Sequence, residues 1–215
     1  MPVNAELGLL RTNTQNWLEN HALIIYGTGG GSGRSDFVLS ESDDQGWITT
    51  VGGLNQPVPL YVMYPQGAYN AKTNGQVSRP FRVHYISMRQ FNTVTQQWEN
   101  AATTQYTLPT GGRTVMVTSK INGCTFGIGS NGGARLVSHL RPPGETVNDR
   151  MELERGISGG FGLGGVVNAR LHSSGTQNGT VVGIRNGNNW TFYAQRFRPS
   201  SSMIGGFIDG VQVYN

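Results

Sequence analysis

Cys124 and His139 are the residues whose types and spacing could support covalent chemistry. Cys124 is the only cysteine of the chain, and His139 follows it fifteen residues later. Two short apolar runs, 125–128 and 134–137, lie between them and are separated by a Gly/Asn-rich turn at 129–133. This pattern predicts a β-hairpin, which would bring the start of its first strand beside the end of its second. A thiol beside an imidazole is the minimal arrangement for an activated thiolate nucleophile, so we predict that the two side chains meet.

The same two residues also have a purely structural interpretation. A lone cysteine usually fills apolar core space, and a lone histidine is usually a polar group with a structural partner. Gly123 favours the chemical interpretation, because a glycine before the cysteine lets the backbone turn tightly or approach a ligand closely. On the residues alone, a Cys–His pair and a core cysteine both stay open.

The segment 121–124, Ile-Asn-Gly-Cys, resembles the Leu-Ser-Gly-Cys motif of the toxin glutamine deamidases, which include the cytotoxic necrotizing factors and the Burkholderia lethal factor. Thr118 stands six residues before the cysteine, where the lethal factor has a catalytic threonine. The similarity continues through the hairpin to Pro142, and segments 181–184 and 190–194 resemble the closing strands of the lethal factor. Asn122 departs from the serine of the motif, the Cys–His spacing is closer to that of the necrotizing factors, and the first hundred residues show no resemblance.

The resemblance implies a role for each of three residues. Cys124 would be the nucleophile and His139 its base, and the reaction would convert glutamine to glutamate through a thioester. Thr118 would orient the imidazole, because a threonine hydroxyl has no useful acidity. The alternative for Thr118 is an ordinary β-branched strand residue with a solvent-facing hydroxyl.

The resemblance also implies a target and a place of action. The substrate would be a specific glutamine of a folded host protein. A DEAD-box translation-initiation helicase, whose deamidation would inhibit translation, is preferred over a Rho-type GTPase. The protein would occupy the bacterial cytoplasm before export and act in the host-cell cytosol, and no cleavable signal peptide is visible. Two alternatives stay open: transglutamination at the same site, and a non-catalytic β-sandwich binding module in which Cys124 fills the core.

Composition indicates the fold class and narrows the functions. The 215 residues suit one domain, 1–215, and 32 glycines with only 13% charged residues favour tight turns and short strands. We therefore predict an α+β fold, a β-sandwich of mixed short strands with a few helices packed outside, as the family resemblance also implies. The net charge of +4 comes without a Lys/Arg cluster, so nucleic-acid binding is not expected. We expect a monomer with no membrane span, no intramolecular disulfide, no cofactor and no metal site.

The expected elements follow from periodicity and turn residues. One amphipathic helix is predicted over 3–19 and a second over 146–156. The glycine-rich stretch Gly27–Ser35 lacks the lysine of a phosphate-binding loop and precedes a strand, so a hairpin loop is expected. Together with 65–79 and 156–165, it is a candidate for selecting the substrate. His84 is predicted on the polar side of its strand in a structural or surface role. The strands are predicted at 21–26, 36–39, 47–51, 59–64, 80–88, 105–108, 114–118, 125–128, 134–137, 166–171, 180–184, 190–197 and 204–213.

Overall fold

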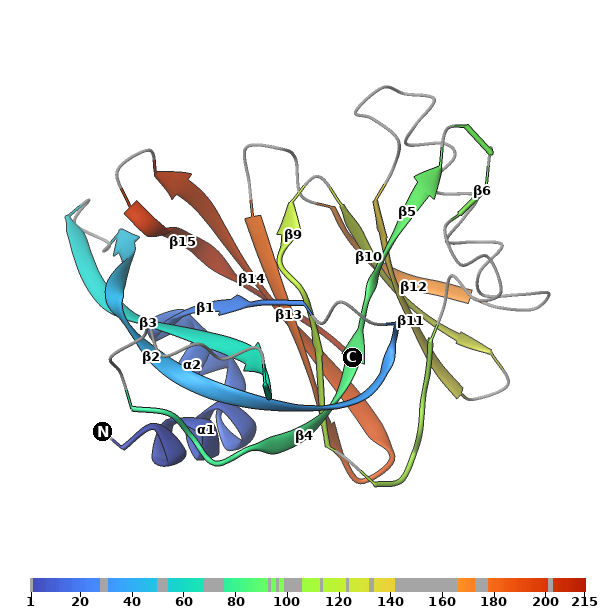
Figure 1. Ribbon diagram of the computed structural model, residues 1–215, viewed down its shortest axis with the longest axis horizontal. Helices are drawn as coiled ribbons and strands as arrows, with labels where there is room; N and C mark the ends of the chain where they lie inside the picture. The colour runs from blue at the N-terminus through green and yellow to red at the C-terminus, as the bar shows by residue number, and fades with distance from the viewer. Residues whose placement is uncertain are drawn as a thin grey trace.

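In the computed structural model, the described part of the chain forms two β-sheets and two short helices (Figure 1). The structure describes residues 1–215 except 1, 28–30, 50–53, 68–75, 93, 96, 99–105, 113, 123, 132–133, 142–165, 173–177 and 201–202. The predicted α+β class, rich in short strands, is confirmed. The predicted helix over 146–156 and the glycine-rich loop 156–165 lie outside the described residues.

The larger sheet has nine strands and curls back on itself. It runs in the order β1-β3-β2-β15-β14-β13-β8-β4, and β9 also pairs with β13. Strand β2 pairs with β15 near its end and with β4 near its start, which brings the last strand of the order back beside the third. The strands are β1 (Ala22–Ile25), β2 (Gly33–Thr49), β3 (Asn55–Pro65), β4 (Phe81–Ile86), β8 (Val115–Thr118), β9 (Ile121–Asn122), β13 (Asn178–Asn186), β14 (Asn189–Ser200) and β15 (Met203–Tyr214).

The smaller sheet has six strands and contains the predicted hairpin. Its order is β12-β10-β11-β5-β6, with β7 also paired to β11. Strands β10 and β11 pair in antiparallel register from Thr125 opposite Leu140 to Asn131 opposite Ala134. The two predicted apolar runs therefore pair as strands of a hairpin. Strand β10 extends through 129–131 of the predicted turn, and 132–133 lie outside the described residues. The strands are β5 (Met88–Asn92), β6 (Gln97–Trp98), β7 (Tyr106–Leu108), β10 (Thr125–Asn131), β11 (Ala134–Arg141) and β12 (Val166–His172).

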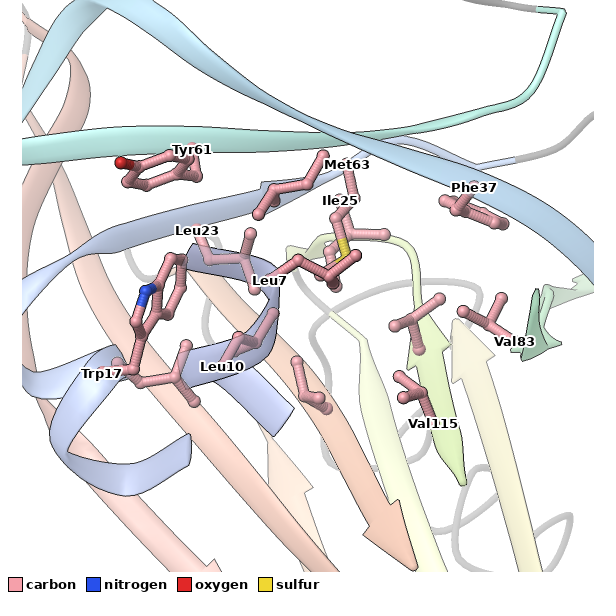
Figure 2. Packing of buried hydrophobic residues seen from close by; sticks show 14 of the residues in the cluster. Leu7, Leu10, Trp17, Leu23, Ile25, Phe37, Tyr61, Met63, Val83 and Val115 are labelled. Atoms are coloured by element: carbon pink, nitrogen blue, oxygen red, sulfur yellow. The ribbon is translucent and has the colours of Figure 1, made fainter. Parts of the chain in front are cut away.

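The larger sheet buries both of its faces, which creates two main cores. One lies against helices α1 (Val3–Thr12) and α2 (Thr14–Asn20), where Leu10 and Trp17 pack near Leu23, and Val115 lies beside Val83 farther along the same cluster (Figure 2). The other lies against the smaller sheet and is called the inter-sheet core here. Its members are Ile86, Leu108, Met116, Ile121, Cys124, Phe126, Ile128, Val137, Val181, Trp190, Phe192 and Ala194.

Side chains of one strand alternate between these cores, because successive residues of a strand point to opposite faces. In β8, Val115 and Val117 face the helices, whereas Met116 joins the inter-sheet core. Thr118 therefore points toward the smaller sheet. In β4 the same alternation sends Ile86 toward the smaller sheet.

The prediction that His84 lies on the polar side of its strand is wrong. It is buried, its Nδ1 lies 3.1 Å from the Tyr106 hydroxyl, and its ring meets that of Trp190 edge-on. The prediction failed because the second face of β4 packs against another sheet rather than water. A structural role for His84 agrees with these contacts.

The predicted helix over 3–19 is instead two helices that meet at Asn13. The Thr14 hydroxyl bonds to the Leu10 carbonyl at 2.7 Å, and Asn13 leaves the helical conformation with φ of −138°. Thr and Asn side chains compete with the helix for backbone partners, which accounts for the break. No helix among the described residues is long and apolar enough to cross a membrane.

Candidate active site

Strand register places Cys124 and His139 on the same face of the smaller sheet. Phe126 of β10 lies opposite His139 of β11. Cys124 precedes Phe126 by two residues and joins the same core as Phe126 and Val137, so it lies diagonally across from His139. The register of the hairpin is therefore the one that a contact between Cys124 and His139 requires. Met88 of β5 lies opposite His139 on its other side, in a parallel pairing.

Thr118 reaches this pair from the opposite sheet. Its Oγ1 lies 2.7 Å from His139 Nδ1 and 2.7 Å from the carbonyl oxygen of Ile86. All three side chains are buried, with exposed fractions of 0% for Thr118, 1% for Cys124 and 0% for His139. The three sequence-predicted residues therefore gather in one layer between the sheets.

The hydrogen bonds of Thr118 fix the tautomer of His139. A hydroxyl has one proton, and the Ile86 carbonyl can only accept it. Thr118 Oγ1 must then accept the hydrogen bond from His139, so the imidazole carries its proton on Nδ1. Nε2 is left with a basic lone pair. This assignment follows from the hydrogen-bond network.

Nε2 of His139 is buried and has no hydrogen-bond partner among the residues that the structure describes. Most buried polar atoms are hydrogen-bonded, and an exception is often a functional group. An imidazole with one nitrogen held by a neighbour and the other unoccupied is arranged as a general base. Its lone pair could accept a proton from a thiol brought within reach.

The thiol of Cys124 is engaged elsewhere in this structure. Its Sγ lies 3.4 Å from Sδ of Met88 and donates to that sulfur. A thioether is only a weak acceptor, so this hydrogen bond holds the thiol only weakly. Met88 thus sits beside both members of the predicted pair.

Burial also keeps the imidazole neutral. Removal from water lowers the pKa of His139 from 6.5 to about 3. In this closed arrangement, burial therefore disfavours an imidazolium at position 139.

Several loops that were predicted to surround the candidate site lie partly or wholly outside the described residues. Gly123 and the loop 156–165 lie outside the described residues, as do parts of 27–35 and 65–79. Strand β2 already begins at Gly33, inside the predicted hairpin loop. No group of three or more His, Cys, Asp or Glu that could hold a metal ion occurs among the described residues.

Sequence reasoning missed two groups at this site. The carbonyl of Ile86 is a backbone group, which no side-chain motif can reveal. Met88 ended a predicted strand, but only the parallel pairing of β5 with β11 places it opposite His139. That pairing joins segments far apart in the sequence, so no local signal could have indicated it.

Comparisons with known proteins give a structural likeness but no match by sequence. No protein-family model matches the sequence, and no curated protein matches it. Among solved structures, the chain is similar to the C-terminal domain of CNFy from Yersinia pseudotuberculosis, with a TM-score of 0.43 and 11% sequence identity over 98% of this chain and 97% of that chain.

Proposed function

We propose that the protein is a protein-glutamine deamidase in which Cys124 is the nucleophile, His139 the general base and Thr118 the residue that orients the imidazole. The observation that carries the proposal is the arrangement of His139. Its Nδ1 is held 2.7 Å from Thr118, while its buried Nε2 has no partner among the described residues and lies on the face that Cys124 shares. This nitrogen lies in the same buried layer as the Cys124 thiol, from which it could take a proton.

In the proposed reaction, Nε2 of His139 takes the proton of the Cys124 thiol, and the thiolate attacks the carboxamide carbon of glutamine. The tetrahedral intermediate collapses, the C–N bond breaks, and the protonated imidazole gives its proton to the departing ammonia. Water, deprotonated by Nε2, then attacks the thioester and releases glutamate and the free thiol. Thr118 keeps the other proton on Nδ1 throughout, so that Nε2 is the nitrogen that exchanges protons.

Activity requires the site to open from the closed arrangement. The thiol must leave Met88 and turn toward Nε2, and the carboxamide must reach a layer in which Cys124 and His139 are fully buried. Opening also restores hydration, which removes the cause of the lowered pKa of His139. We infer that substrate binding supplies the free energy for this opening.

This requirement favours a folded protein as the substrate. A free glutamine offers little contact beyond the carboxamide, whereas a protein surface can contribute binding energy remote from the reacting group. We propose a host protein, with the DEAD-box translation-initiation helicase ahead of the Rho-type GTPase, as the sequence motifs suggest. Initial rates on free glutamine, on such a helicase and on such a GTPase would test this, and comparable efficiency on free glutamine would refute protein specificity.

The burial of Cys124 favours a second candidate function, a non-catalytic β-sandwich binding module. In that case the cysteine fills apolar space beside Phe126 and Met88. Thiol reactivity separates the two, because an activated thiolate reacts with iodoacetamide near pH 6 and a permanently buried thiol does not. Under our proposal, Cys124 is alkylated at this pH when the protein substrate is present, and His139→Asn slows that alkylation. If Cys124 is not alkylated at this pH either with or without the protein substrate, the result would support the binding module.

A further inference from the structure

A polar pocket opens at the other end of the inter-sheet layer, away from Cys124. Leu108 and Ser130 lie on either side of Arg135 in register across β7, β11 and β10. These residues form one wall of a pocket of about 190 Å³. Thr110 and the turn residues Asn188, Asn189 and Trp190 complete it. Arg135 precedes His139 by four residues on the same strand, a separation of roughly 13 Å, so the pocket is distinct from the candidate active site.

Arg135 is a half-buried cation in this pocket. It makes no hydrogen bond or ion pair with any residue that the structure describes. A guanidinium presents five donors and no acceptor, and partial burial weakens the water contacts that would otherwise satisfy it. The other polar lining groups, two hydroxyls and two amides, can all donate as well.

The walls of the pocket are held in place by a second arginine. Arg185 donates to the carbonyls of Thr110 and Gly187, each at 2.6 Å, and to that of Gly112 at 2.7 Å. The indole Nε1 of Trp190 donates to the Pro109 carbonyl at 3.2 Å. These bonds tie the segment 109–112 to the turn between β13 and β14. The pocket is therefore preformed, which reduces the entropic cost of binding a ligand.

Arg135 is the one charged side chain among the described residues that line the pocket. A cleft lined by one sign of charge concentrates ligands of the opposite sign. We infer that this pocket binds a small oxyanion, a carboxylate or phosphate group of a ligand, with Arg135 as the principal donor and the hydroxyl and amide groups around it as secondary donors.

The inference is tested by titrating the protein with inorganic phosphate and, separately, with acetate at constant ionic strength. The signal is the NMR shift of the Trp190 indole N–H, assigned with Trp190→Phe. We expect a saturable shift with at least one anion. Arg135→Gln should weaken binding at least about tenfold, and Arg135→Lys should weaken it less, because it keeps the charge and loses the planar fork.

The matched control is Arg141→Gln, which removes the same charge from an exposed position of the same strand and should leave the titration unchanged. Tighter binding of phosphate would identify a phosphoryl ligand, and tighter binding of acetate an acidic side chain. The absence of a saturable shift with either anion, or equal weakening by Arg135→Gln and Arg141→Gln, would overturn the inference.

Discussion

Acidification should destabilise the protein through His139, and the size of the effect follows from its burial. The pKa of His139 is about 3 in the folded protein, because burial penalises the charged form, and 6.5 is its ordinary value. Between these pH values the unfolded chain binds one more proton than the folded chain. The free energy of unfolding therefore falls as the pH falls below 6.5, by up to about 1.4 kcal/mol per pH unit, until the folded pKa is reached.

The contribution of His139 between about pH 7 and pH 4.5 is then on the order of 2.5 kcal/mol. Urea unfolding at several pH values across this range measures it. The matched variant is His139→Asn, whose amide can still donate to Thr118 but does not titrate. Groups other than His139 contribute equally to both proteins and cancel in the comparison of slopes.

We expect the wild-type free energy of unfolding to fall more steeply with acid than that of the variant, with the difference between the two shrinking by about 2.5 kcal/mol. If the Asn variant does not fold, His139→Gln serves the same purpose. Parallel stability curves for wild type and variant would refute the reasoning, since they would mean that His139 is solvated or already charged in the folded protein.

Two further predictions use matched pairs of variants. Thr118→Val removes the acceptor of the Nδ1 proton, which should cost about 1–3 kcal/mol of stability and lower the deamidation rate on the order of ten- to a thousand-fold. Thr118→Ser keeps the hydroxyl and should retain both stability and rate. Equal effects of the two variants on rate would contradict an orienting role. Gly46→Ala would place a methyl group against the Cβ of Ala22 and should lower the free energy of unfolding in urea by about 1–3 kcal/mol. The matched variant Gly33→Ala, in the same strand, meets nothing within 4 Å and should be tolerated. Equal stabilities of the two variants would contradict the packing of β2 against β1.

The hairpin could be predicted because its signals are local. Two apolar runs and a Gly/Asn-rich turn determine both the pairing of β10 with β11 and the common face of Cys124 and His139. Thr118 was indicated by family resemblance alone. Its strand belongs to the other sheet, and its contact with His139 depends on how the two sheets pack, which residue spacing does not reveal.

The failures have the opposite origin, since they depend on contacts between distant segments. The face of β4 that carries His84 was expected to be polar, yet it packs against the smaller sheet. Strand β2 was expected as two strands, 36–39 and 47–51, but one continuous strand spans Gly33–Thr49 because β3, β4 and β15 all pair with it. The burial of Cys124 and its contact with Met88 likewise depend on the parallel pairing of β5 with β11.

The central claim is that Cys124 converts glutamine to glutamate in a host protein. The most direct measurement incubates the purified protein with eukaryotic cell lysate and maps glutamine-to-glutamate changes by mass spectrometry, with Cys124→Ser as the control. Sulfur-to-oxygen replacement keeps the shape of the side chain, so the variant should remain folded, which circular dichroism can verify. We predict a change at a specific glutamine of a folded protein with the wild type and none with the variant. The absence of any site-specific change, the same change with Cys124→Ser, or amine adducts in place of glutamate would contradict the account.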